Sequence, residues 1–333
     1  MEATAASVTP SFSAWRQPGF YVTFVLVLIG GGSVILMGQD TLRETAFTVL
    51  MFVGLAASLN ILMGYAGYVN FGHIVFFGLG GYFGFYLVSQ FNMPLFPAAI
   101  AGGLLSVILA LVVGAAVLRL RGAYFALATI GINEAARAFV SNFTPFGGST
   151  GMYVNFSSYD EYGGAAEALW HTFTLLWLVI MVLVVVSFLV KNSRFGLGLI
   201  AIREDEDTAM VMGVRAPREK TLAFCLSAFF PGVIGTLYFF KNGNVEPEDA
   251  FRFQMSLEIL VMVMLGGKGT VLGPVLGAFA YERMRGLLLT SIFFKNLHLA
   301  VSGLFLLLIV LFVPGGVVGW VRTRFPRWRR FLE

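Results

Sequence analysis

Three polar residues inside an apolar stretch are the side chains most able to do chemistry. Asn133, Glu134 and Arg137 lie within residues 123–141, which otherwise read as a membrane helix. Spacings of three and four place Glu134 and Asn133 beside Arg137 on a helix surface. Ionisable groups inside a membrane are costly and usually functional, and an arginine there can bind a carboxylate through two hydrogen bonds. We therefore predict that these residues belong to a substrate pathway. An ion pair that only fixes helix packing is the alternative.

A second candidate site lies in the glycine-rich segment 60–84, where Asn60, Asn70 and His73 interrupt apolar sequence. Glycine permits a membrane helix to unwind where its backbone lines a cavity, and broken helices of this kind form substrate sites in transporters. The sequence thus predicts a broken helix whose three polar side chains line the pathway. The alternative is close helix packing through glycine, with polar groups that hydrogen-bond internally.

A second glycine-rich turn occurs in residues 265–279, after an apolar lead like the one before the first. Residues 58–62 read SLNIL and residues 256–260 read SLEIL. This parallel suggests an internal duplication of about five spans per half, as transporter folds often show. Glu282, Arg283 and Arg285 cluster after the second turn, and we expect a structural pairing there.

The polar segment 191–220 combines an acidic run with apolar residues and helix punctuation. Ser193 can begin a helix, and Gly213 stands where a helix would end. Acids are favoured in the first turn of a helix by its dipole. We predict a short amphipathic helix outside the membrane that receives a partner protein, and a solvated interfacial loop is the alternative. The residues that would form this receiving surface are the charged run Arg203, Glu204, Asp205, Glu206 and Asp207, the apolar residues Ala209 and Met212, and Gly213 at the end.

The composition predicts that these residues belong to a membrane protein. Of the 333 residues, 58% are hydrophobic and only 12% are charged, whereas a soluble domain carries about 25% charged residues. Apolar runs long enough to cross a bilayer recur along the chain. We predict an all-α polytopic membrane protein of about ten helices, with broken or re-entrant segments. The expected spans are 20–37, 45–63, 68–89, 96–118, 123–141, 169–190, 219–240, 255–266, 271–292 and 297–314.

The basic residues predict the orientation of these spans. An even number of spans puts both termini on one side, and most Lys and Arg residues fall in the loops and tail of that side. The positive-inside rule makes that side cytoplasmic. The expected parts are a cytoplasmic segment 1–19, a transmembrane domain 20–318 that includes the loop 191–220, and a basic cytoplasmic tail 319–333. The external loop 142–168 is long for a simple turn and is a candidate docking surface.

Several other classes of function are excluded by what the sequence lacks. One cysteine and three widely spaced histidines provide no metal-ligand spacing. There is no P-loop and no nucleophile–base constellation, so we expect neither catalytic residues nor ATP binding in this chain. The basic residues lie in short loops rather than in a stripe suited to nucleic acid. An ion-coupled transporter that uses His73, Glu134 and Arg137 remains the competing hypothesis.

Several motifs, in matching order over roughly residues 45–315, resemble bacterial branched-chain amino acid ABC transporter permeases of the M type. Residues 68–70, Tyr-Val-Asn, depart from the pattern of many members. The motifs that carry the resemblance are Gly64-Tyr65-Ala66-Gly67, Phe71-Gly72-His73, Phe76-Phe77-Gly78-Leu79-Gly80-Gly81-Tyr82, residues 118–129, Ser193-Arg194-Phe195-Gly196, residues 201–206, Gly213-Val214 and residues 265–278.

The resemblance implies a half-channel in a bacterial inner membrane that pairs with a homologous H-type permease. Two ATPase subunits, which carry the ATP and Mg, would dock on a coupling helix at residues 203–213. A periplasmic substrate-binding protein would deliver the cargo from outside. The implied activity is import of amino acids, branched-chain ones first, by alternating access. The family also includes relatives that move urea, amides or other small polar solutes, so these remain the alternative cargo.

Overall fold

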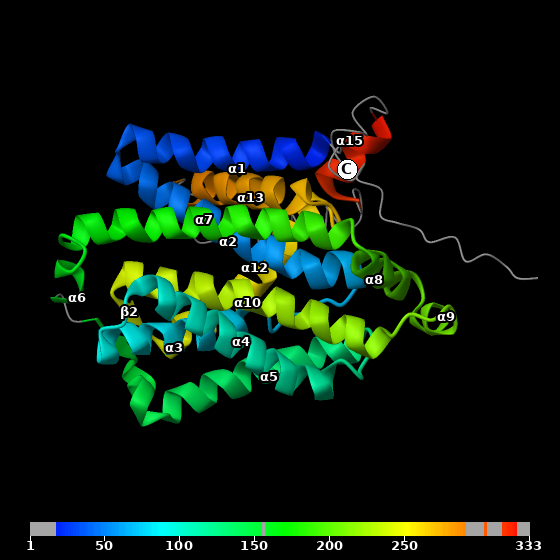
Figure 1. Ribbon diagram of the computed structural model, residues 1–333, viewed down its shortest axis with the longest axis horizontal. Coiled ribbons are helices and arrows are strands. Elements are labelled where there is room, and N and C mark those ends of the chain that lie inside the picture. Colours follow the sequence, from blue (N-terminus) through cyan, green and yellow to red (C-terminus); the bar gives the residue numbers. More distant parts are fainter. Residues whose placement is uncertain (1–17, 155–156, 291–302, 305–314, 325–333) are drawn as a thin grey trace, which may run out of the picture.

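The computed structural model of the chain describes residues 18–154, 157–290, 303–304 and 315–324. Long helices run side by side through most of this part, as Figure 1 shows. In the first half they are α1 (Pro18–Met37), α2 (Asp40–Asn60) with its π-helical extension η2 (Ile61–Ala66), α3 (Ile74–Phe91), α4 (Leu95–Val117) and α5 (Ala123–Asn142). In the second half they are α7 (Ala165–Lys191), α10 (Ala216–Asn242), α12 (Phe253–Gly266) and α13 (Leu272–Thr290).

Short elements lie at the two ends of this helical body. At one end, α8 (Arg194–Glu204) and α9 (Glu206–Val211) project beyond the long helices (Figure 1). At the other end lie η3 (Thr144–Phe146), η4 (Gly148–Thr150), β1 (Met152–Tyr153), α6 (Ser157–Asp160), β2 (Asn244–Val245) and α11 (Pro247–Ala250). The last described helix is α15 (Gly316–Arg324), which runs across the expected boundary at residue 318.

In the part of the chain that the structure describes, six helices are long and apolar enough to cross a bilayer: α1, α2 with η2, α3, α4, α7 and α10. The chain is therefore a multi-pass, all-α membrane protein, as the composition predicts. Helix α5 follows its expected span, α12 is as short as expected with 14 residues, and α13 has 19. The expected tenth span, 297–314, lies almost wholly outside the described residues, as do most of the segments 1–19 and 319–333.

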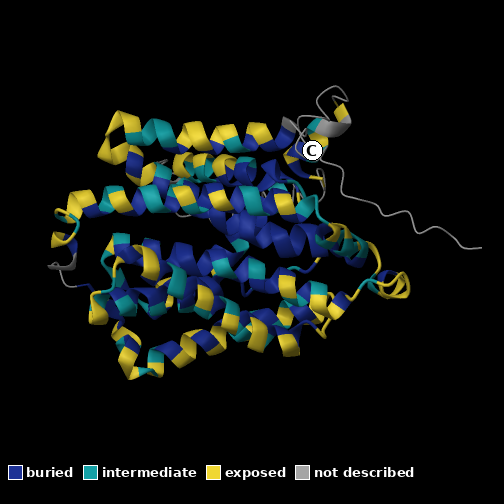
Figure 2. Cartoon of the chain, viewed as in Figure 1, coloured by how far each residue is buried: buried dark blue, intermediate teal, exposed yellow. Residues whose placement is uncertain are grey.

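The core lies where α3, α4 and α10 pack against one another, and Figure 2 shows that α2 and α10 are mostly buried. The backbones of α3 and α10 approach so closely that a Cβ added to Gly80 would lie 2.5 Å from the Cα of Gly232. Ser106 on α4 donates a hydrogen bond to the carbonyl of Phe76 at 3.0 Å. Small residues and a backbone-bound hydroxyl are the usual means by which membrane helices pack this tightly.

The glycine-rich segment 60–84 combines both structures that its sequence allows. The helix ends after η2 at Gly67, whose φ of 80° is left-handed, and α3 begins only at Ile74. Residues 68–73 are therefore not helical, and the expected third span is wrong at its start. The later glycines, from residue 78 to residue 84, instead sit against side chains and backbone of neighbouring elements. The break thus precedes α3, and close packing accounts for the glycines within it.

The expected external loop is folded back onto the helical body. Strands β1 and β2 pair antiparallel, with Met152 opposite Val245. The hydroxyl of Tyr159 donates to the carbonyl of Phe240 at 2.8 Å, and that of Tyr162 accepts from the backbone N–H of Leu95 at 2.8 Å. These bonds fix the segment as a cap over this end of the helices.

Charges in α12 and α13 pair with one another, as expected. The Nη1 of Arg285 lies 3.3 Å from Glu282 and 3.9 Å from Glu258, so one guanidinium serves two carboxylates. Arg283 is separate and stacks over the ring of Phe279, 5.4 Å from its centroid. A buried carboxylate without such a partner would be strongly destabilising.

Candidate functional site

The predicted coupling helix is two helices that meet at Asp205. The Ser193 hydroxyl accepts a hydrogen bond from the N–H of Gly196 at 3.1 Å and so caps α8. Asp205 is extended, and its carboxylate accepts from the N–H of Thr208 at 2.7 Å, which caps α9. Because an aspartate cap starts a new helix, the prediction of one continuous helix is wrong. Gly213, with a φ of 93°, lies just beyond the C-terminus of α9, where the sequence placed a helix end.

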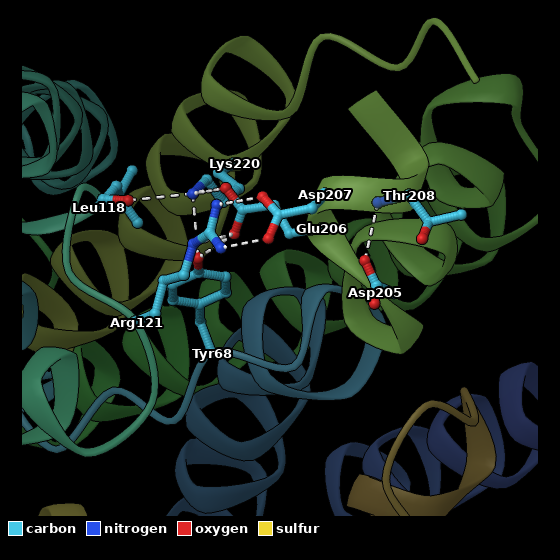
Figure 3. A network of polar contacts seen from close by, with 8 residues as sticks. All are labelled: Tyr68, Leu118, Arg121, Asp205, Glu206, Asp207, Thr208 and Lys220. Carbon is cyan, nitrogen blue, oxygen red and sulfur yellow. Dashed lines mark hydrogen bonds and ion pairs between the residues drawn. The ribbon is translucent and has the colours of Figure 1, made fainter. Parts of the chain in front are cut away.

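Behind α9 lies a network of charges that Figure 3 shows in close-up. The Nζ of Lys220 on α10 donates to Glu206 at 2.6 Å, to the hydroxyl of Tyr68 at 2.9 Å and to the carbonyl of Leu118 at 3.0 Å. The Tyr68 hydroxyl in turn donates to Glu206 at 2.7 Å. The side chain of Lys220 is 4% exposed, so these contacts replace the water that its charge would otherwise require.

Arg121 adds the turn between α4 and α5 to this network. Its guanidinium donates two hydrogen bonds to Asp207, at 2.9 and 2.8 Å, in the bidentate geometry that Arg and carboxylates favour. Its Nε also lies 3.5 Å from Glu206. The network therefore joins α9 to α10, to the α4–α5 turn and to the non-helical segment after η2.

The electrostatics of the network favour its charged form. Burial alone would raise the pKa of Glu206, but hydrogen bonds from Lys220 and Tyr68 and the charges of Lys220 and Arg121 outweigh it and leave that pKa below its usual range. The hydrogen bonds and charge of Arg121 lower the pKa of Asp207. Burial, together with Glu206, raises the pKa of Tyr68 and keeps its hydroxyl protonated as a donor.

The network separates the predicted coupling residues into inward and outward groups. Glu206 pairs with Lys220 and Asp207 with Arg121 of the same chain. Ala209 lies on the buried face of α9. On the outer surface, Val211 is 86% exposed and Met212 is 80% exposed, with Met210 beside them. Glu204 is also exposed, and among the described residues its ion pair is with the adjacent Arg203. The acidic residues therefore hold α9 in place. The exposed side chains of Met210, Val211 and Met212 form an apolar tip at its C-terminal end.

Arg203 connects α8 to the first glycine-rich turn. Its Nη1 donates to the carbonyl of Gly64 at 2.9 Å, and the stem of its side chain lies against Gly67. A Cβ added to Gly67 would lie 2.7 Å from the Cγ of Arg203, so the glycine makes room for this contact as well as for its left-handed φ.

The buried side chain of Asn60 bridges the two glycine-rich turns. Its Oδ1 accepts from the N–H of Gly269 at 2.9 Å, and its Nδ2 donates to the carbonyl of Thr270 at 3.0 Å. Both bonds span more than 200 positions of sequence. Asn60, predicted to line a pathway, thus binds the turn between α12 and α13 to the end of α2.

The other predicted interior residues are buried and partly satisfied. The Nε2 of His73 lies 3.0 Å from the hydroxyl of Ser58, and the Oδ1 of Asn70 accepts from the N–H of Gly72 at 3.0 Å. Asn133 donates to the carbonyl of Phe251 at 2.9 Å. One polar atom of each side chain, namely His73 Nδ1, Asn70 Nδ2 and Asn133 Oδ1, is buried and has no hydrogen-bond partner among the described residues.

Glu134 and Arg137 lie on a different surface from Asn133. The Nε and Nη2 of Arg137 donate to one oxygen of Glu134, at 3.0 and 2.8 Å, which confirms the predicted pairing. The pair is open: the side chain of Glu134 is 51% exposed and that of Arg137 is 44% exposed. Asn133 lies on the buried face of α5 instead. The structure therefore divides the predicted pathway residues between the interior and the outward face of α5.

Sequence reasoning missed Tyr68, Arg121 and Lys220 as functional candidates. Tyr68 stands out in the sequence only as a departure from a family pattern, Lys220 only as a basic residue that orients the chain, and Arg121 only as such a residue within the motif 118–129. The available signal was an excess of acids in residues 204–207, which requires cations nearby, but nothing in the sequence indicates which cations these are.

Comparisons with known proteins agree with this architecture. Residues 42–311 match the family described as the permease component of branched-chain amino acid transport systems. The chain is 28% identical to the high-affinity branched-chain amino acid permease proteins LivM of Salmonella typhimurium and Escherichia coli, over 94% of this chain and 77% of each relative. It is 27% identical to a probable LivM protein of Methanocaldococcus jannaschii, over 81% of this chain and 92% of that one.

No solved structure matches the chain, so the family assignment rests on the sequence match alone. That match covers well over half of the residues, including both glycine-rich turns, the α8–α9 segment and α5. The chain therefore belongs to the permease family of branched-chain amino acid transport systems.

Proposed function

We propose that the chain is one of two permease subunits in an ATP-driven importer of amino acids, with branched-chain amino acids as the first cargo. It pairs with a homologous H-type permease in a bacterial inner membrane, with both of its termini in the cytoplasm. Two ATPase subunits, which hold ATP and Mg, bind from the cytoplasmic side. A periplasmic binding protein delivers the cargo to the cap formed by β1, β2 and the segment 142–168. Urea and amides are the alternative cargo.

The observation that carries this proposal is the way the α8–α9 segment is attached. Arg203 binds the end of α2, Glu206 binds Lys220 of α10, and Asp207 binds Arg121 beside α5. A solvated loop would need none of these bonds. A segment that must transmit force from an attached partner to several helices needs all of them, because coupling requires a physical linkage between the two sites.

The apolar tip of α9 supplies the surface for the ATPase. Met210, Val211 and Met212 are exposed beside the charged contacts that fix the helix. Exposed methionines and aliphatic side chains next to a polar rim are typical of protein interfaces. In the proposed cycle, ATP closes the ATPase dimer, α9 moves with it, and the two permeases open to the opposite side of the membrane.

The test is purification of the tagged chain from its native membrane in a mild detergent, followed by mass identification of the chains that accompany it. We expect a second permease and ATPase subunits, and ATP-dependent uptake of leucine after reconstitution with the binding protein. Val211→Asp with Met212→Asp should lose the ATPase subunits but keep the second permease. Tyr153→Ala, an exposed change at the opposite end, is the control and should retain both.

Uptake by the chain alone, without ATP, would contradict the proposal. It would favour the ion-coupled alternative, in which His73, Glu134 and Arg137 carry the coupling. In that case the α8–α9 segment would have no partner, and the two aspartate substitutions at its tip would leave transport unchanged.

A further inference from the structure

The outward face of α5 presents charges where a membrane helix should not. Glu134 lies near the middle of this 20-residue helix, and Arg137 lies one turn beyond it. Both side chains are about half exposed. Charges at this depth face protein or water rather than lipid, because contact with hydrocarbon is costly. On the proposed function, on which this inference rests, the face looks toward the second permease and the path between the two subunits.

Among the described residues, the pair leaves unused the Nη1 group of Arg137, which carries two N–H donors, and one carboxylate oxygen of Glu134. Both hydrogen bonds from Arg137 go to the Oε2 of Glu134, through Nε and Nη2. Among the described residues, the Nη1 of Arg137 and the Oε1 of Glu134 have no partner. A cation and an anion with free hydrogen-bonding atoms side by side match a ligand that carries both charges on neighbouring atoms. We propose that Glu134 and Arg137 bind the zwitterionic head group of the amino acid during its passage, with its carboxylate on Arg137 and its ammonium group on Glu134.

The energetics suit a transient site rather than a storage site. An exposed ion pair contributes little by itself, so its exchange for contacts with a zwitterion is nearly balanced. The pair has no net charge, and neither does the cargo. A transporter needs a site that the cargo can enter and leave. Glu134 and Arg137 provide one, because they pair with each other again when the cargo departs.

The residues around the pair leave room for the cargo and contact its side chain. A Cβ added to Gly131, one turn before Glu134, would meet nothing within 4 Å. Ala135 and Ala138 lie on the same exposed surface. Leu127, which is exposed two turns before Glu134 on the same face, supplies an apolar group for an aliphatic side chain. The face therefore offers small residues at its centre, charges for the head group and an apolar group beyond them.

The first test measures leucine taken up per ATP hydrolysed by the reconstituted complex. Glu134→Gln with Arg137→Gln should lower this ratio about tenfold or more, because hydrogen bonds to charged groups are among the strongest available. Arg137→Lys keeps the positive charge but loses the planar guanidinium that makes two hydrogen bonds to a carboxylate, and should give an intermediate ratio. The apparent KM, which the binding protein sets, should stay unchanged while the maximal rate falls.

A steric test uses two glycines that the structure makes comparable. Gly131 on α5 and Gly30 on α1 are both exposed, and a Cβ at either one meets nothing within 4 Å. Gly131→Trp should block uptake, whereas Gly30→Trp, on an exposed face of α1 far from the pair in sequence, should not. A third test replaces Cys225 by serine and labels Ala138→Cys with a negatively charged, water-soluble thiol reagent. We expect much faster reaction there than at Gly30→Cys.

The outcomes separate this proposal from the function on which it rests. Wild-type uptake per ATP in the double glutamine variant or in Gly131→Trp would overturn the zwitterion site and leave the importer intact. Lack of labelling at Ala138→Cys in every nucleotide state would do the same. If urea or an amide were the only solute transported, the site would also be refuted. Absence of ATPase subunits and of ATP-dependent uptake would instead refute the proposed function.

Discussion

Arg121 and Asp207 lie 86 positions apart and are joined by two hydrogen bonds of 2.9 and 2.8 Å. This contact is the link between α9 and the turn that begins α5. Helix α5 otherwise makes few contacts with the long helices around it and lies at the edge of the molecule (Figure 1). A displacement of α9 therefore reaches α5 through the guanidinium of Arg121, and also through Glu206 and Tyr68, whose ring packs edge-on against Phe125 of α5 with 5.0 Å between the ring centroids.

We expect Arg121→Ala to lower leucine uptake per ATP by about 2- to 30-fold, the range typical of residues that transmit coupling. Thermal stability in detergent should hardly change, because the pair is exposed and screened by water. Arg119→Ala is the matched control. Arg119 is two residues away, and its side-chain hydrogen bond among the described residues is to the carbonyl of Ala115 in α4. Exchange of the pair, Arg121→Asp with Asp207→Arg, should restore part of the uptake. Full coupling in Arg121→Ala would show that the link is dispensable.

Lys220 should contribute mainly to stability. Lys220→Met removes the cation that faces Glu206 in a nearly buried site, and loss of one partner of such a pair costs about 3 kcal/mol. The melting temperature of the purified protein should fall accordingly. Glu206→Gln added to Lys220→Met should recover part of the loss, because no unpaired charge then remains. Arg218→Met, an exposed change two residues earlier, should leave the melting temperature unchanged; a similar loss there would indicate a general sensitivity of α10.

The network should weaken in acid rather than in alkali. The pKa of Glu206 lies below its usual range, so its stabilising effect is complete above the unfolded-state pKa of about 4.3 and disappears as the pH falls through the lower, folded-state value. The difference in melting temperature between wild type and Glu206→Gln should thus be constant from pH 7 to about pH 5. It should shrink below about pH 4. A difference that vanished near neutral pH would contradict the lowered pKa.

Asn60 should act as a bridge between the two halves of the chain. Asn60→Ala leaves the N–H of Gly269 and the carbonyl of Thr270 without this partner in a half-buried turn, where an unsatisfied group costs up to about 1–3 kcal/mol. We expect a large drop in melting temperature and faster proteolysis near residue 268. Asn142→Ala is the control, because Asn142 is exposed and bonds only within α5. Equal melting temperatures for the two variants would contradict the bridging role.

Much of the fold could be predicted from the sequence because it depends on local composition. Apolar runs located most of the spans, and the glycines after Asn60 indicated a break. The position of that break differed, since residues 68–73 leave the helix before α3 rather than within it. Glycine allows both unwinding and close packing, and only the neighbouring elements decide between them. Gly67 faces Arg203, whereas Gly80 faces the backbone of α10.

The candidate site was predictable only as a set of residue types. The spacing of Glu134 and Arg137 predicted their pairing because both lie on one helix. No local pattern could show that Asn133, their neighbour, faces the interior while they face outward. Nor could it show that Glu206 binds Lys220 and Tyr68 instead of a partner protein.

The sequence by itself determined that this chain crosses a membrane several times and to which family it belongs. These properties follow from hydropathy and from short motifs, which act over one helix at a time. The tertiary structure decided which charged side chains are buried in ion pairs within the chain and which remain exposed. The bonds made by Asn60, Arg121 and Arg203 join residues 86 to 210 positions apart, and only the packing of whole helices brings such positions within hydrogen-bonding distance.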